Sequence, residues 1–238
     1  MTTRFLSLLL PLYLLCGNPT TVPSLELDKQ ETALAIAEQA KRLGITEAEA
    51  MSSLETLRVD DPQRYTLTLF YLLTGGDQWK CQRGQRNWLT PKNLEEWEGL
   101  TVDETGNVTK LVRSWCNIKG PFPHSLFSLV QLNELVLHGN KLTGTIPSII
   151  GNLKHLRKLG LGGNELTGRL PVSELRKLPE LETLLVHNNH FDLPEGVTND
   201  RWGGGLWIRN DRGAVQELVK KLDSSKQLST RHEHLKIN

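Results

Sequence analysis

Cysteine is scarce in this chain of 238 residues, which holds only Cys16, Cys81 and Cys116. Three cysteines are too few for a disulfide-built miniprotein or for a zinc cage of four cysteines. An excess of one charge is lacking as well, because 28 lysines and arginines face 27 aspartates and glutamates, for a net charge of +1. A chain so balanced has no polybasic face for general binding to nucleic acid or to a membrane surface.

Long apolar runs are absent after the first residues of the chain. One charge at Arg4 precedes a largely apolar stretch over residues 5–15, and a polar stretch containing proline follows it. A spanning helix needs about 20 apolar residues, so this layout indicates a secretory signal peptide, with an uncleaved anchor as the alternative. We predict a signal peptide over residues 1–24, a secreted mature protein and no stable membrane insertion after cleavage.

The secretory route makes a modification site relevant. Asn107, Val108 and Thr109 form a sequon for N-glycosylation. Its asparagine ends a turn, DETGN, between the strand-like runs LTV and VTKLV. We therefore predict that Asn107 is exposed and glycosylated.

Helix signals, rather than repeats, fill the chain between the signal peptide and Gly75. Thr46 followed by Glu49 is a capping box, and Asp61 followed by Pro62 is an N-cap with a first-turn proline. These signals predict a helical extension over residues 25–60 and a further helix that begins at Pro62.

Internal repetition decides the fold class. Leucines recur at intervals of 24, 24 and 25 residues, at Leu111, Leu135, Leu159 and Leu184. A column in the same register contains Cys116, Asn140, Asn164 and Asn189. A coil that turns after each short strand leaves backbone amides and carbonyls pointing inward, and stacked asparagines supply both donors and acceptors for them. We predict that this column is a structural ladder, in which Cys116 replaces asparagine.

The motifs LTGTIP and LTGRLP, with the leucine columns, make the chain resemble a leucine-rich repeat protein of the plant-type extracellular subclass. The segments TLTLFYLLTGGDQWK and NWLTPKNLEEWEGLTVDETGNVTKL are similar to the amino-terminal cap of that subclass, although Val102 stands where many such caps have cysteine. The resemblance therefore implies an amino-terminal cap over 61–110. Three tryptophans with equal spacing are interpreted as its core rather than as a sugar platform: Trp79, Trp88 and Trp97. The resemblance implies an α/β solenoid, a short right-handed coil of about four repeats with parallel strands on its concave face. Its parts are expected as repeats over 111–194, a carboxy-terminal cap over 195–223 and a flexible tail over 224–238. Within the cap we expect a helix over 211–222 with an apolar stripe of Val215, Leu218, Val219 and Leu222.

Two features depart from the repeat pattern. Because Cys116 occupies the inward asparagine column, a free buried thiol is favoured for Cys81, and a disulfide to Cys116 is the alternative. Arg113 stands where an inward aliphatic residue belongs. An unpaired buried charge is costly, so we expect Arg113 to reach water past the cap or to pair with Asp103 or Glu104.

No constellation of residues predicts catalysis, a metal or a cofactor. Cys81 lacks a positioned histidine, and the glycines at 203–205 lack the lysine and hydroxyl residue of a phosphate loop. His232 and His234 lie in the predicted tail without further ligands. We predict that the protein is not an enzyme and binds no cofactor; a small hydrolase with an unrecognised site is an alternative.

The concave face is the candidate binding surface, because side chains that alternate with the strand leucines point out of it. The predicted ligand-binding residues are Val112, Ser114, Trp115, Val136, His138, Gly160, Gly162, Leu185 and His187. The glycines predict a notch between the two histidines, with relief of crowding as the alternative. We predict a secreted recognition module for a protein, a peptide or a cell-wall polymer; the alternative is a scaffold that acts through residues 25–60.

Overall fold

The computed structural model describes residues 36–37, 41, 46–81, 87–193, 207–208 and 213–220. The predicted signal peptide, most of the first part of the helical extension, the glycines at 203–205 and the tail with its two histidines lie outside the described residues.

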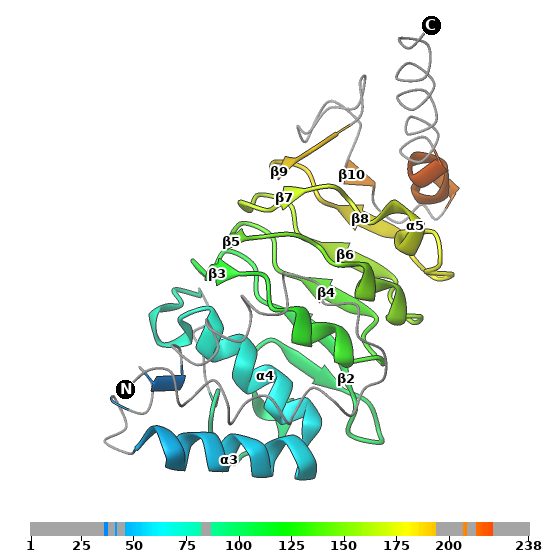
Figure 1. Cartoon of the computed structure of the whole chain (residues 1–238). Helices are drawn as coiled ribbons and strands as arrows, with labels where there is room; N and C mark the ends of the chain where they lie inside the picture. Colours follow the sequence, from blue (N-terminus) through cyan, green and yellow to red (C-terminus); the bar gives the residue numbers. More distant parts are fainter. Residues whose placement is uncertain are drawn as a thin grey trace, which may run out of the picture.

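Two helices pack together at one end of the molecule, α3 (Glu47–Asp60) and α4 (Pro62–Leu73) (Figure 1). The predicted capping box is present at the start of α3, since Thr46 Oγ1 accepts a hydrogen bond from the amide of Glu49 and the Glu49 carboxylate accepts one from the amide of Thr46. Asp61 caps α4 as predicted, with its carboxylate accepting from the amide of Arg64. Helix α3 buries no side chain, whereas α4 buries one face against the first coil.

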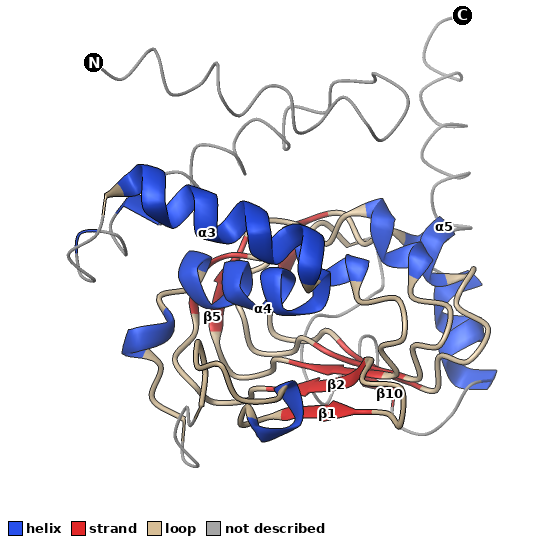
Figure 2. Ribbon diagram, turned by 90° about the horizontal axis from the view of Figure 1, so that it is seen from below, coloured by secondary structure: helices blue, strands red, loops and turns tan. Residues whose placement is uncertain are grey.

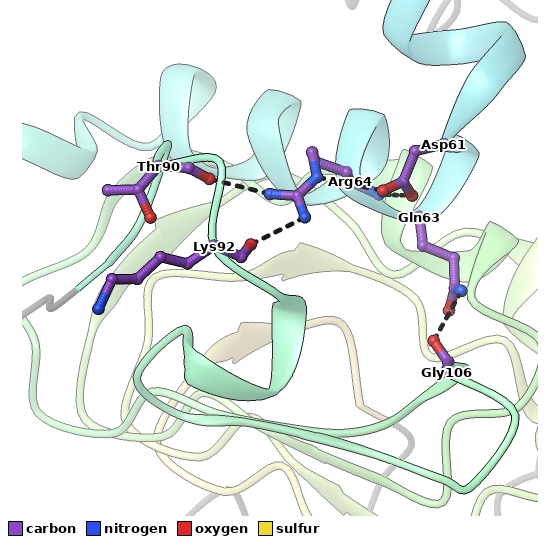
Figure 3. A network of polar contacts seen from close by, with 6 residues as sticks. All are labelled: Asp61, Gln63, Arg64, Thr90, Lys92 and Gly106. Atoms are coloured by element: carbon purple, nitrogen blue, oxygen red, sulfur yellow. Dashed lines mark hydrogen bonds and ion pairs between the residues drawn. The ribbon is translucent and has the colours of Figure 1, made fainter.

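Polar side chains at the start of α4 tie this helix to the loops of the cap (Figure 3). The guanidinium of Arg64 donates to the carbonyls of Thr90 and Lys92, each at 2.9 Å. Gln63 donates to the carbonyl of Gly106 at 3.2 Å, in the turn of the following hairpin. These contacts fix α4 across the cap, so that its apolar face closes the end of the repeat core.

The core of the cap is aromatic. Trp79, Trp88 and Trp97 are buried and their rings form a continuous series with Phe70 and Tyr71 of α4. The interpretation of the three tryptophans as cap core is confirmed. Two 3-10 turns, η2 (Gly76–Gln78) and η3 (Leu94–Glu96), lead the chain through this core into the predicted hairpin of β1 (Leu100–Val102) and β2 (Val108–Val112).

One six-stranded sheet runs the length of the molecule, in the order β1-β2-β4-β6-β8-β10. It contains β4 (Glu134–Val136), β6 (Lys158–Gly160), β8 (Thr183–Leu185) and β10 (Trp207–Ile208). The four central strands are parallel, and a terminal strand pairs antiparallel at each end. The leucine repeat matches the register of this sheet, because the recurring leucines are paired directly on neighbouring parallel strands: Leu111, Leu135, Leu159 and Leu184.

The rest of each coil returns along the other sides of the core (Figure 2). Short parallel pairs form between β3 (Lys119–Pro121) and β5 (Lys141–Thr143), and between β7 (Thr167–Gly168) and β9 (His190–Phe191). Helical turns follow at η4 (His124–Ser128), η5 (Ser148–Asn152) and α5 (Val172–Leu175). Two further columns of apolar residues that recur with the repeat are wholly buried between these layers: Leu126, Ile150 and Leu175, and Leu132, Leu156 and Leu181. The fold is the predicted α/β solenoid.

Asparagines bridge neighbouring coils as predicted. The Oδ1 atom of Asn140 accepts from the amides of Cys116 and Ile118 in the preceding coil, while its Nδ2 donates to the carbonyls of Arg113 and Leu137. Asn164 and Asn189 repeat the arrangement one and two coils later. Each buried amide side chain therefore satisfies backbone groups of two coils at once.

Residues 213–220 form a helix at the opposite end from α3 and α4 (Figure 1). Val215, Leu218 and Val219 are buried on one side of it. The described part of the predicted carboxy-terminal cap helix thus carries the expected apolar stripe.

The favoured free thiol at Cys81 is wrong, because Cys81 and Cys116 form a disulfide. The amide of Cys116, rather than its sulfur, takes part in the ladder by donating to Asn140. In addition, the amide of Lys80 donates to the carbonyl of Cys116 at 2.7 Å and holds the cap segment alongside. The sulfur of Cys116 is therefore available to Cys81, and the cap is joined to the first coil without a cysteine at position 102.

Arg113 also departs from the prediction. Its side chain is only 3% exposed, so it does not reach water, and the guanidinium carbon lies 5.3 Å from the ring centroids of both Trp79 and Trp88. Burial lowers the pKa of Arg113 to about 10, and the carboxylate that opposes this shift is that of Glu98 rather than the predicted Asp103 or Glu104. The aromatic rings of the cap cover the inward position that Arg113 occupies. The guanidinium makes cation–π contacts with two of them, Trp79 and Trp88.

Candidate functional site

The candidate binding surface is the face of the long sheet that points away from the buried leucines. Because strand side chains alternate with a period of two, three rows cross this face at right angles to the strands. The first row is Lys110, Glu134, Lys158 and Thr183; the second is Val112, Val136, Gly160 and Leu185; the third is Ser114, His138, Gly162 and His187.

The second row is less exposed than the sequence suggested. Val112 is 40% exposed, but Val136 and Leu185 are 3% and 5% exposed, and Gly160 is buried. The expected exposure of these three positions is wrong. Val136 and Leu185 lie on interior strands with a neighbour on each side, and β10 pairs with β8 beside Leu185. Of the four positions in this row, only Val112 in the first coil offers exposed apolar surface.

The predicted notch is filled by neighbouring side chains. A Cβ atom added to Gly162 would lie 2.6 Å from Cε1 of His187, so the imidazole occupies the space above this glycine. A Cβ atom on Gly160 would lie 3.1 Å from Cγ1 of Val136. The prediction of an open strip between His138 and His187 is wrong, and the alternative that glycine relieves crowding describes these positions.

A compact group at the first two coils remains accessible, and we name Val112, Ser114, Trp115 and His138 the aromatic patch. Trp115 is 65% exposed. Its ring meets the imidazole of His138 edge-on, with centroids 5.8 Å apart, and Nδ1 of His138 lies 3.1 Å from the hydroxyl of Ser114. The patch thus combines apolar surface with a fixed hydrogen-bonding pair, as protein recognition sites do.

A charged depression lies on the same sheet toward the start of the strands, and it was not predicted from the sequence. It has a volume of about 310 Å³ and is lined by Lys110, Asn133, Glu134, Arg157, Lys158, Glu182 and Thr183. The hydrogen bond from Lys110 lowers the pKa of Glu134, whose carboxylate also lies 3.7 Å from Nζ of Lys158. The same two-residue alternation that placed Val112 on this face would have placed Lys110 there as well.

The glycosylation candidate, Asn107, lies at the end of the β1–β2 turn as predicted but is half-buried rather than fully exposed. Its Nδ2 donates to the hydroxyl of Thr105 at 2.7 Å and to the carboxylate of Asp103 at 3.3 Å. These bonds are made by the amide that would carry a glycan; since a glycosylated amide keeps only one N–H, a modified Asn107 would give up at least one of them.

The described residues contain neither a cluster of metal ligands nor a free thiol at Cys81. Within them no three side chains of histidine, cysteine, aspartate or glutamate come together to hold a metal ion. The sulfur of Cys81 is bonded to Cys116 and is not a thiolate nucleophile. Nor is any helix in this part of the chain both long and apolar enough to cross a bilayer.

The comparisons with known proteins agree with the geometry. A family model described as leucine rich repeat matches residues 122–191, which include both the LTGTIP and the LTGRLP motif. This part of the chain consists of leucine-rich repeats. No curated protein matches the chain.

Solved structures similar to this chain cover about half of it. The BIR3–SERK2 complex from Arabidopsis thaliana aligns with 24% identity over 52% of this chain and 69% of the other, with a TM-score of 0.44. The HAESA ectodomain from Arabidopsis thaliana, in complex with an IDA peptide hormone, aligns with 28% identity over 49% of this chain and 20% of the other, with a TM-score of 0.41. A plant ice-binding protein aligns with 18% identity over 54% and 48% of the two chains, with a TM-score of 0.41.

Proposed function

We propose that this protein is a secreted recognition module that binds a protein or peptide through the aromatic patch. The observation that carries the proposal is the exposure of Val112 and Trp115 on a face where Val136 and Leu185 are covered, together with the contacts that His138 makes with Trp115 and Ser114. Exposed tryptophans in the centre of a small apolar surface are the residues on which binding energy concentrates in protein interfaces.

The proposal is one of binding rather than catalysis. The hydroxyl of Ser114 lies 3.1 Å from Nδ1 of His138, and both belong to the face of the sheet that points away from the buried leucines, where they can contact a ligand. Hydrogen bonding to a ligand requires only the fixed positions that the pair already has.

A pull-down with the chain over residues 25–238 tests the site. We expect Val112→Ser and His138→Ala to reduce capture of extracellular partners at least tenfold, or about 1.4 kcal/mol, without changing the melting temperature. The matched control is Val59→Ser on α3, where the valine is 70% exposed and distant in sequence from the patch. Equal capture by the wild type and both patch variants would contradict the proposal.

The same experiment addresses the scaffold alternative, which the exposed surface of α3 favours. Helix α3 buries no side chain, so its outer face is available to a partner. Loss of capture in Val59→Ser, with retention in Val112→Ser, would move the interaction to the helical extension. Retention of the wild-type protein by insoluble cellulose or chitin would identify a cell-wall polymer as the ligand instead.

Secretion is tested through Asn107. In a eukaryotic secretory host we expect the protein in the medium, with an apparent mass that falls on enzymatic deglycosylation. Asn107→Gln and Thr109→Ala should each remove that shift. Because Thr109→Ala destroys the sequon but keeps the Asn107 side chain that stabilises the turn, the same result from both variants would show that loss of the sequon, and not loosening of the turn, is the cause. An intracellular protein that retains residues 1–24 would contradict secretion.

A further inference from the structure

The backbone at Trp115 is unusual for its residue type. Trp115 has a φ of 57°, in the left-handed region, and the positions that succeed it in the next three coils have the same conformation, at Gly139, Gly163 and Asn188. Glycine and asparagine are the residues that adopt this conformation readily, whereas a bulky side chain there is strained. The solenoid therefore needs a left-handed residue at this turn, and three of four coils use one that suits it.

Burial does not explain the tryptophan either. At 65% exposed, Trp115 leaves most of its ring in water and gains little from the hydrophobic effect. Strain that neither local preference nor packing accounts for is typical of functional positions. The first coil thus carries a side chain that folding alone would replace with glycine or asparagine.

The indole is nevertheless held in a fixed place. A Cβ atom added to Gly139 would lie 2.3 Å from Cδ2 of Trp115, so the ring rests directly on the backbone of the next coil. One side of the indole is supported by Gly139 and its edge is met by His138. Most of its remaining surface is open to solvent.

The charged depression supplies the second half of the surface. Among its lining residues, Lys110, Arg157 and Lys158 outnumber Glu134 and Glu182, and Glu134 is shared by two lysines. Lys158 is held only at 3.7 Å, so its ammonium group can take a further carboxylate. With a strand rise of about 3.3 Å per residue, Lys110 at the depression lies roughly 13 Å from Ser114, which is next to Trp115 in the chain.

We propose that the ligand is an extended acidic peptide with two anchors: a proline or aromatic ring that stacks on Trp115, and a carboxylate three to five residues away that pairs with Lys158 and Lys110. This inference rests on the proposed function and specifies its ligand. The interior strands use their own amides to bond one another, so side chains rather than strand pairing would hold the peptide. A neutral sugar would engage the ring but would not engage the lysines.

A phage-displayed library of random dodecapeptides, selected on the chain over residues 25–238, is the probe. We expect enriched peptides to share a ring residue and an acidic residue three to five positions apart. One enriched peptide, synthesised and labelled, should bind Trp115→Gly and Trp115→Asn at least tenfold more weakly. Both variants should melt no lower than the wild type, because they carry the residues of the following coils. Lys158→Gln should weaken binding severalfold and reduce its dependence on salt.

Val59→Ser and Lys141→Gln are the controls, because each changes an exposed residue of the same type outside the concave face, and neither should alter binding. Enriched peptides without the acidic residue, or equal binding by the wild type and both Trp115 variants, would overturn the inference. If Val112→Ser and His138→Ala still weakened binding in that case, the proposed function would stand without it. Binding unaffected by every variant of the concave face would overturn both.

Discussion

The guanidinium of Arg113 and the indole of Trp79 lie 5.3 Å apart, which places a cation of the first coil inside the aromatic core of the cap. Trp88 lies at the same distance, so two rings flank the charge. The arrangement couples the cap to the repeats at the position where later coils have only aliphatic side chains.

Replacement of Arg113 by methionine should leave the free energy of unfolding at pH 7 unchanged or raise it by about 1 kcal/mol. Burial lowers the pKa of Arg113 to about 10. A base whose pKa is lower in the folded than in the unfolded state destabilises the fold while it is protonated, fully so below about pH 10, and less as the pH rises toward its ordinary value. Contact with the rings offsets part of this cost.

Urea denaturation of the wild type and Arg113→Met at pH 7 and at pH 11 measures the effect, with Lys92→Met as the control for an exposed cation of the cap. Any advantage of Arg113→Met should shrink at pH 11. A loss above about 2 kcal/mol at pH 7 would show instead that the guanidinium holds a network that the cap requires.

Asn140→Leu should destabilise the protein by about 3 kcal/mol or more. The side chain satisfies two backbone amides and two backbone carbonyls that are buried, and each group left without a partner costs about 1–3 kcal/mol. Asn152→Leu makes the same chemical change at an exposed position and should have little effect. Similar melting temperatures for the two variants would contradict the role of the ladder.

The disulfide between Cys81 and Cys116 should contribute about 2–4 kcal/mol to stability, since it closes a loop across a sequence separation of 35. Non-reducing peptide mapping should find the two cysteines in one linked peptide. The double variant Cys81→Ala and Cys116→Ala should melt at the same temperature as the wild type kept in reductant. Two free thiols in the folded, secreted protein would contradict the assignment.

Gly162→Ala should cost about 1–2 kcal/mol, because the new methyl group would meet the imidazole of His187. In a His187→Ala background the same change should cost less than half as much. A double-mutant cycle in denaturant isolates this coupling. Equal costs in the two backgrounds would show that the imidazole does not occupy the space above the glycine.

Much of the repeat architecture could be predicted because it depends on spacing. The strand register follows from the leucine period, and the ladder follows from the need of inward backbone groups for partners, so Leu135 and Asn140 lie where the sequence predicts. Helix starts at Thr46 and Asp61 were likewise decided by adjacent residues.

The features that could not be predicted depend on contacts between segments whose positions in space do not follow from the spacing of residues in the sequence. Arg113 meets rings from two cap loops, and Cys116 meets a cysteine that the path of the cap brings alongside it. The exposure of Val136 and the filling of the notch depend on the direction in which each side chain points over its neighbours. The order of residue types in the sequence does not specify that direction. Position on the concave face was predictable, but accessibility was not.

The asparagine ladder also has a direction. The amides of Ile118, Leu142 and Leu166 are each satisfied by an asparagine that comes 22 or 23 positions later in the chain. On the ribosome, a coil therefore emerges before the side chain that completes its hydrogen bonding. The newest coil of the growing polypeptide stays unfinished until its successor is made, so the solenoid is expected to close coil by coil, one repeat behind translation.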